Sequence, residues 1–296
     1  MRRGFVDTPD GQLHYWEHGP PAGPPLVLVH LTPDARCFLD AMLHLGVRGR
    51  RTISVDMPGY GDSERPPRPY EEIGAFADQV ARVPPALGIE RYDLLGHMTG
   101  ANVAAELAAR HPHAVSRLVL SELVDWRAHA EHRGSHARQF PAPAPERDGR
   151  HLLALWDQYA TMLDEEPGEV RIEDVQRRFL ALWLATYQGP PIGDLGADAG
   201  ARAIYGEVGW SAAAPHTIES QALSERLAAI TAATLLLCAG EGVLRTGADP
   251  RADRDRLVAL LPRGEALTVA GVSHVWPHTR PAAFAETVER FLHDTA

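Results

Sequence analysis

The chain has 296 residues and a formal net charge of -10, and 45% of its residues are hydrophobic. These values describe an ordinary globular protein with room for one large domain, or for one domain that carries an insertion. The negative charge argues against nucleic acid and anionic membranes as partners, because phosphate binding requires a concentrated basic face. The polar residues that follow Arg3 leave no apolar segment for a secretory signal. Cys37 and Cys238 are the only cysteines, so we expect a reduced, cytoplasmic setting.

Strand and helix patterns alternate along the first 126 residues. An Asp10-Gly11 turn predicts a hairpin over residues 4 to 18, and short apolar runs predict strands that are buried on both faces. This alternation predicts a doubly wound, mostly parallel α/β sheet. The expected strands are 24–30, 52–56, 92–95 and 117–122, and the expected helices are 34–48, 71–87 and an Ala-rich helix through 103–112.

From about residue 127 to residue 225 the alternation stops. Clustered prolines, several aromatic residues and helical periodicity without buried strands predict a helical cap inserted into the sheet domain. The alternation then resumes with strands at 234–240 and 266–270 and helices at 251–261 and 280–293. We therefore expect residues 1–126 and 226–296 to form the core domain and residues 127–225 to form the cap.

The stretch Gly96-His97-Met98-Thr99-Gly100 lies between a buried strand and the Ala-rich helix. It has the form of a nucleophile elbow, G-x-S-x-G, in which the middle residue adopts a strained conformation and presents its side chain at the top of the sheet. Here the middle residue is Met98. A thioether has no proton for a base to remove and cannot carry an acyl group through turnover, so covalent catalysis of the serine type is excluded at this position.

The chain resembles the α/β-hydrolase superfamily over nearly its whole length. The elbow is one of four motifs in the family's order. The other three are His30-Leu31-Thr32-Pro33 in the place of the H-G-x-P oxyanion loop, residues 56–63 as the D-x-P-G-x-G-x-S loop, and Gly271-Val272-Ser273-His274 where the family carries its catalytic histidine. The chain is also similar to a subset of the family with a G-H-x-T-G elbow that lacks serine, and to cofactor-free dioxygenases of this fold, in which the histidine does the essential work. The resemblance implies the same fold and no cofactor.

Three departures from the family pattern bear on the reaction. Met98 replaces the nucleophile, and Leu31 stands where the oxyanion loop usually has glycine. After the strand predicted at 234–240 the family usually has Gly-x-x-Asp, whereas this chain has Gly240-Glu241-Gly242-Val243. The catalytic aspartate is therefore missing unless Asp249 takes its role. The histidine is kept.

We assign His274 as a general base that works near neutral pH, with a retained packing residue as the alternative. A catalytic histidine needs an acceptor for its second ring nitrogen. Glu122 is the first candidate for that acceptor, and an N-cap or rim carboxylate is an equally good reading of it. Asp249 and Asp125 are the second candidates.

The oxyanion hole is made of backbone N–H groups, which a side-chain replacement at position 98 does not remove. Thr32 and Thr99 are the expected donors. We expect the Thr99 side chain to point along its helix, away from the pocket, which argues against it as a substitute nucleophile. His30, His97, Asp125 and Trp276 are expected around the pocket, with His30 and His97 in structural roles.

Three histidines at 129, 132 and 136 have a spacing that places imidazoles on one helical face. Gly134 interrupts that helix and Arg133 adds positive charge, so a solvated cap segment is the better interpretation. We expect no metal there.

The resulting hypothesis is an enzyme that binds a small, largely apolar, oxygen-bearing substrate between sheet and cap, with secondary metabolism as its expected setting. His274 and Glu122 would transfer protons in an elimination, cyclisation, isomerisation or cofactor-free oxygenation. Two alternatives stay open. One is hydrolysis by water that His274 activates directly, and the other is a non-catalytic protein that keeps the pocket for ligand binding.

Overall fold

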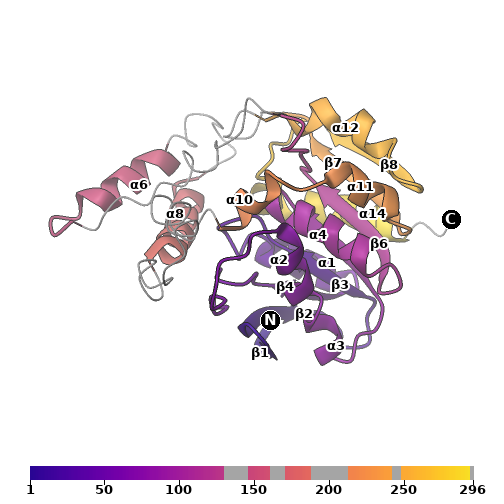
Figure 1. Cartoon of the computed structure of the whole chain (residues 1–296), viewed down its shortest axis with the longest axis horizontal. Coiled ribbons are helices and arrows are strands. Elements are labelled where there is room, and N and C mark those ends of the chain that lie inside the picture. Colours follow the sequence, from indigo (N-terminus) through magenta and orange to yellow (C-terminus); the bar gives the residue numbers. More distant parts are fainter. Residues whose placement is uncertain (130–145, 161–170, 188–212, 242–247, 294–296) are drawn as a thin grey trace.

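A computed structural model describes residues 1–129, 146–160, 171–187, 213–241 and 248–293. Within these ranges eight strands form one sheet in the order β1-β2-β4-β3-β5-β6-β7-β8 (Figure 1). Strands β1 and β2 form an antiparallel hairpin, and β2 also pairs antiparallel with β4. The remaining neighbouring strands all pair in parallel. The predicted doubly wound α/β sheet is therefore confirmed. The strands are β1 (Arg2–Thr8), β2 (Gly11–His18), β3 (Pro25–Val29), β4 (Arg51–Val55), β5 (Tyr92–His97), β6 (Val115–Ser121), β7 (Ala233–Ala239) and β8 (Gly264–Val269).

Helices cover both faces of the sheet. On one face α2, α4, α11 and α12 contribute to the larger core cluster, and on the other face α1, α13 and α14 contribute to the second. The helices are α1 (Leu39–Val47), α2 (Ile73–Val80), α3 (Val83–Ala86), α4 (Thr99–Arg110), α6 (Arg150–Ala160), α8 (Ile172–Tyr187), α10 (Ala213–Ile218), α11 (Leu223–Ala229), α12 (Pro250–Val258), α13 (Trp276–Thr279) and α14 (Pro281–His293).

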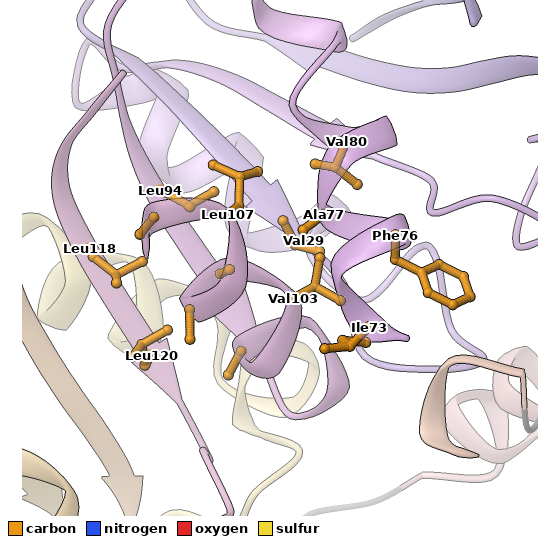
Figure 2. Close-up of a cluster of buried hydrophobic side chains, with 14 of the residues drawn as sticks. Val29, Ile73, Phe76, Ala77, Val80, Leu94, Val103, Leu107, Leu118 and Leu120 are labelled. Atoms are coloured by element: carbon orange, nitrogen blue, oxygen red, sulfur yellow. The ribbon is translucent and has the colours of Figure 1, made fainter. Parts of the chain in front are cut away.

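The central strand β3 shows why its sequence is apolar throughout. Val27 and Val29 belong to one core cluster, whereas Leu26 and Leu28 belong to the other, and all four are fully buried. Side chains alternate between the faces of a strand, so a strand covered by helices on both sides needs apolar residues at every position. Figure 2 shows Val29 packed among side chains of α2 and α4 on the first of these faces.

Two expected helices differ from the structure. The helix predicted over 34–48 begins only at Leu39, because Asp34 turns the preceding loop and accepts a hydrogen bond from the Arg36 N–H. The helix predicted over 71–87 is divided into α2 and α3. Pro84 and Pro85 have no N–H groups to donate to the carbonyls of the preceding turn, so the first helix ends before them.

The segment predicted as a cap is described in part. Helices α6 and α8 pack against each other, and Figure 1 shows them beyond one side of the sheet. Helices α10 and α11 instead pack against α4 of the core. The cap and its boundaries at residues 127 and 225 stay a prediction. Among the described residues, no helix combines the length and the apolar character that a membrane crossing requires.

Candidate active site

The turn between β5 and α4 has the backbone of a nucleophile elbow. Met98 lies in it with φ 52° and ψ -116°, a conformation that is costly for a residue with a side chain. Gly96 and Gly100 make the turn possible through close approach. A Cβ on Gly96 would overlap the carbonyl oxygen of Gly100, and a Cβ on Gly100 would overlap that of Val29. The two glycines thus let strand, helix and the neighbouring β3 pass in backbone contact.

The side chain at the elbow is the one that reaches outward. Every residue from Tyr92 to Gly100 is buried except Met98, which is partly exposed. Met98 contacts the edges of both core clusters, so it stands at the end of the sheet between its two faces. A thioether at this point offers apolar contact and a weak acceptor, and no nucleophile of the hydroxyl or thiol kind.

The two loops expected to supply the oxyanion hole lie in contact. The hydroxyl groups of Thr32 and Thr99 form a hydrogen bond of 2.8 Å, and both residues are buried. The expectation that the Thr99 side chain points away along its helix was wrong. Its position at the first turn of α4 leaves the hydroxyl free to cross to the loop after β3. The backbone N–H of Thr99 lies at the N-terminus of α4, where helix N–H groups lack partners within the helix.

His30 joins the oxyanion loop to the loop after β4. Its Nδ1–H donates to the Leu31 carbonyl oxygen at 2.7 Å, and its Nε2 accepts the Met57 N–H at 2.9 Å. These partners fix a neutral imidazole, and burial lowers the pKa of His30 further from its ordinary value. A histidine whose two nitrogens are both engaged in this way holds loops in place and is not placed to transfer protons.

His97 and Trp276 were expected around the pocket, and the structure places both in the core. Neither side chain has exposed surface. His97 forms a hydrogen bond of 3.0 Å with the Ser121 hydroxyl and packs edge-on against Phe38. Trp276 packs edge-on against Phe284 of α14, because α13 turns the indole ring inward toward the second core cluster. These two residues therefore pack in the core beneath the site.

Glu122 follows β6 and adopts φ 57°. Its carboxylate accepts the Ala239 N–H at 2.6 Å, and its side chain is buried. Burial raises the pKa of Glu122 to about 7, the hydrogen bond from Ala239 opposes the rise, and the charge of Asp249 adds to it. A buried carboxyl group with a pKa near neutrality is able to hold or release a proton under physiological conditions.

The other two candidate acids are engaged by arginines. Asp249 caps α12, and its carboxylate accepts hydrogen bonds from the backbone and the guanidinium of Arg251, which lowers its pKa. Asp125 accepts from Arg256 at 3.1 Å. Both carboxylates are thus compensated by an adjacent cation, whereas Glu122 is held by a backbone N–H.

His274 lies on the loop between β8 and α13 and is buried. This loop is attached to the end of β7, because the Glu241 N–H donates to the Val272 carbonyl oxygen at 3.0 Å and the Gly271 N–H donates to the Glu241 carboxylate at 3.3 Å. The same end of β7 carries the Ala239 N–H that Glu122 accepts. The proposed base and its first candidate acid are therefore on loops that share one strand end.

The sequence patterns missed a second histidine near the site. His278, four residues after His274, has its Nε2 3.3 Å from an Asp34 carboxylate oxygen, and both side chains are buried. Asp34 in turn lies two residues after Thr32. This contact joins the histidine loop to the oxyanion loop. An acidic residue directly after the H-x-x-P motif was the signal in the sequence, although its partner follows 244 residues later.

Of the three histidines considered as a metal face, only His129 is described. Its Nε2–H donates to Asp253 of α12 at 2.7 Å. His132 and His136 lie outside the described residues, as do Gly134, Gly242, Val243, Tyr205 and Trp210.

Comparisons with known proteins agree with this geometry. Residues 24–155 match the family model described as alpha/beta hydrolase fold. The chain is similar to 2-hydroxymuconate semialdehyde hydrolase of Pseudomonas sp. strain CF600, with 38% identity over 35% of this chain and 38% of the relative. It is also similar to haloalkane dehalogenase of Mycobacterium marinum, with 30% identity over 39% of this chain and 40% of the relative. The chain thus spans about two fifths of the length of these relatives, which are enzymes by name.

Solved structures extend the likeness to the whole chain. A probable hydrolytic enzyme from Pseudomonas aeruginosa PAO1 superposes with a TM-score of 0.75 at 20% identity, over 99% of this chain and 95% of the other. A hydrolase from Pseudomonas aeruginosa PA01 gives a TM-score of 0.73 at 21% identity, over 99% and 98% of the two chains. Such identities establish the fold and no more. With its sheet order, its elbow and these likenesses, the chain has the α/β-hydrolase fold.

Proposed function

We propose that this protein is an enzyme that acts on a small, largely apolar carbonyl compound by proton transfer, without a covalent intermediate on the protein. His274 is the general base, Glu122 supports its imidazole, and the N–H groups of Thr32 and Thr99 hold the oxygen on which negative charge develops. The observation that carries the proposal is the strained turn at Met98 beside the bonded pair Thr32 and Thr99. The donors that would bind an oxyanion surround Met98, whose thioether is not a nucleophile for acyl transfer.

The threonine pair strengthens this frame. When two hydroxyl groups form one hydrogen bond, one of them donates its proton and the other keeps its own proton for a further partner. Thr32 and Thr99 together therefore retain one O–H donor beside their backbone N–H groups. Fixed donors aimed at a developing oxyanion contribute a large part of the rate in enzymes of this kind.

The acid–base pair follows from the state of the three candidate carboxylates. Asp249 and Asp125 are each neutralised by an arginine. Glu122 is buried at the end of β6 with a pKa raised to about 7 by burial, so a positive charge that forms on a neighbouring imidazole would favour its ionised form. Elimination, cyclisation, isomerisation and cofactor-free oxygenation each have forms that begin when a base removes a proton from the carbon next to a carbonyl group or from a hydroxyl group itself, which is the step that this arrangement suits.

A second function is favoured by the names of the relatives. 2-Hydroxymuconate semialdehyde hydrolase and the putative carbamate hydrolase of Caulobacter vibrioides both add water to their substrates by name. In a site without a nucleophile, His274 would remove a proton from water, and the water would attack the carbonyl carbon directly. The oxyanion frame would serve this reaction equally well.

Isotopes in the solvent separate the two reactions. We would incubate the protein with a panel of ketones, β-keto esters and 2-hydroxy-6-oxodienoates in D2O, and then in H2(18)O. Proton abstraction predicts deuterium at the carbon next to the carbonyl, and hydrolysis predicts (18)O in a carboxylate product. In both cases we expect no mass increase of the protein during turnover.

The same panel tests the non-catalytic alternative. A compound that binds, without exchange, turnover or (18)O incorporation, supports a binding protein. A covalent acyl adduct on any residue would contradict the proposed mechanism.

A further inference from the structure

A second group of ionisable side chains lies away from the elbow, where the first hairpin meets the loop after β4. His14 of β2 and Asp56 after β4 are fully buried, and Asp62 lies in the same loop with 37% of its side chain exposed. One ligand atom of each residue lies within 4.8 Å of the others. His14 belongs to none of the four sequence motifs, and Asp56 and Asp62 belong to the D-x-P-G-x-G-x-S loop.

The orientation of the His14 ring is set by Asp56. Its Nδ1–H donates to Asp56 Oδ2 at 2.8 Å, and the same oxygen accepts the Asp62 N–H at 2.9 Å. The backbone fixes the pair further, because the Asp56 N–H donates to the His14 carbonyl oxygen at 3.0 Å. A carboxylate that accepts a hydrogen bond from Nδ1–H fixes the tautomer in which Nε2 carries a lone pair. It also fixes the orientation of the ring, and therefore the direction of that lone pair. This is the arrangement that orients histidine ligands in metalloproteins.

The remaining atoms of the cluster are all acceptors. Nε2 of His14 and Oδ1 of Asp56 are buried, and neither has a hydrogen-bond partner among the described residues. Nε2 lies 4.0 Å from Asp62 Oδ2, which is too long for a hydrogen bond even if the ring were doubly protonated. The Arg36 guanidinium is 3.9 Å from that oxygen and half-exposed, so it offsets the charge of Asp62 only weakly. Buried acceptors without protein donors are places where a water molecule or a cation supplies the missing contact, and the carboxylates of this cluster favour a cation.

We propose that His14 and Asp62, with Asp56 orienting the imidazole, form a binding site for a divalent transition-metal ion such as Zn²⁺ or Mn²⁺. Bonds of about 2.0 to 2.2 Å to nitrogen and oxygen let one ion join atoms up to roughly 4.2 Å apart. The 4.0 Å between Nε2 and Asp62 Oδ2 falls within that span. A donor set of one imidazole and carboxylate oxygens suits these ions better than Ca²⁺ or Mg²⁺, which prefer oxygen alone.

The ion would have open positions toward a small cavity. Asp62 lines a cavity of about 80 Å³, whose wall also includes Asp34 and Arg177 of α8. Water or an oxygen atom of a small ligand would complete the coordination from that side. The site stands apart from the chemistry assigned to His274, so its test does not depend on the proposed reaction.

The experiment uses the full chain without an affinity tag, after removal of metal by a chelator. Titration calorimetry with ZnCl2, and separately with MnCl2, is expected to give one equivalent of bound metal. Asp62→Asn keeps the size and the backbone N–H and is expected to weaken the affinity at least tenfold. Asp56→Asn is expected to weaken it by about 10- to 100-fold through the orientation of His14.

Asp78→Asn is the matched control. Asp78 is also a half-exposed carboxylate beside an arginine, 3.4 Å from Arg110, and lies outside the cluster. Its metal affinity is expected to equal that of the wild type. Diffraction at the zinc absorption edge from a soaked crystal is expected to give an anomalous peak between His14 and Asp62.

Three results would overturn the proposal. The first is an absence of saturable metal binding to a wild-type protein with native circular dichroism. The second is an unchanged affinity in Asp62→Asn, which would assign the binding to surface histidines. The third is an anomalous peak at any other position alone.

Discussion

The ends of β5 and β6 invite comparison, because the same backbone geometry carries opposite side chains there. Met98 and Glu122 are the two non-glycine residues with positive φ in the described part of the chain, at 52° and 57°. Each follows its strand directly, and each donates its N–H to the neighbouring strand: Met98 to the Ser121 carbonyl oxygen of β6 at 2.8 Å and Glu122 to the Leu237 carbonyl oxygen of β7 at 2.9 Å. One turn presents a thioether and the other a buried carboxyl group.

Both turns have a strained backbone, but only the turn at Glu122 carries a side chain that is able to exchange a proton. A positive φ costs of order 1 kcal/mol or more for such residues and persists where the surrounding structure enforces it. At Met98 the glycine contacts enforce it. At Glu122 the strand ladder and the Ala239 N–H do so. Under the proposed mechanism the site is a frame with one reactive turn, and each side of that contrast is open to experiment.

The largest effect is expected from His274→Ala, which removes the base that both turns would serve. Proton transfer acts in the transition state, so turnover should fall by roughly 10²- to 10⁴-fold while ligand affinity changes only a few-fold. Steady-state kinetics with a binding measurement on the same compound provide the check. An unchanged turnover rate would remove His274 from the mechanism, and the contrast between the turns would then lose its catalytic meaning.

Glu122→Gln should lower turnover by a smaller factor, about 10-fold or more, because the amide still accepts the Ala239 N–H and cannot compensate an imidazolium charge. The matched control is Asp249→Asn, since Asp249 is engaged by Arg251. If Asp249→Asn is the more damaging of the two, the assignment of the acid to the Glu122 turn is incorrect.

Glu122→Gln should raise the free energy of unfolding at alkaline pH, although it lowers turnover. Burial raises the pKa of Glu122 from 4.5 to about 7, so the folded protein holds a proton there that the unfolded chain releases at lower pH. The stabilisation from this proton is complete below pH 4.5 and is lost as the pH rises through 7. The variant should therefore match the wild type near pH 4 and exceed it at pH 8, by up to roughly 3 kcal/mol. Urea denaturation at both pH values measures the difference, and a variant that is less stable at pH 8 would count against a protonated Glu122.

Thr32→Val removes one hydroxyl of the threonine pair and keeps the backbone N–H. The expected result is a turnover rate lowered a few-fold to about 10-fold with little change in KM, because the lost donor acts on charge that develops in the transition state. Thr32→Ser should retain most of the activity. A loss in Thr32→Ser together with full activity in Thr32→Val would instead indicate that the Thr32 methyl group matters through packing and the hydroxyl group does not.

Met98→Ser makes the two turns alike in polarity and should affect the native reaction least. The wild type should resist a fluorophosphonate probe, because a thioether is not a nucleophile for it. The variant should react with it if the oxyanion frame and His274 are aligned with position 98. Intact-mass spectrometry reports the adduct. Labelling of the wild type, particularly at Thr99, would contradict the reading of Met98 as an inert occupant of the elbow.

The sequence predicted the sheet well, because its signals were local. A continuous apolar run marked β3, and the spacing of Gly96 and Gly100 marked the elbow. Trp276 was predicted to lie around the pocket, and the direction of its side chain depends on a turn that the sequence does not specify. The turn into α13 points the indole toward Phe284 instead.

Contacts between distant segments were not predictable in the same manner. The pair of Asp34 and His278 and the pair of His14 and Asp56 each join residues on separate strands or loops. Neither has a fixed spacing that a motif would capture, because the lengths of the segments between them are set by the fold. Packing also decided which of the three acids are hydrogen-bonded directly to an arginine, because α12 brings Arg251 to Asp249 and Arg256 to Asp125.

The imidazole of His30 has a consequence for the motions of the site. It is bonded on one side to the Leu31 carbonyl oxygen and on the other to the Met57 N–H. The Met57 amide hydrogen is therefore able to exchange with solvent only when the ring leaves it, and that movement disturbs the oxyanion loop as well. The loops after β3 and β4 should open as one unit, with a single opening free energy in native-state hydrogen exchange. A ligand that binds the oxyanion loop would then slow the exchange of an amide that it never touches.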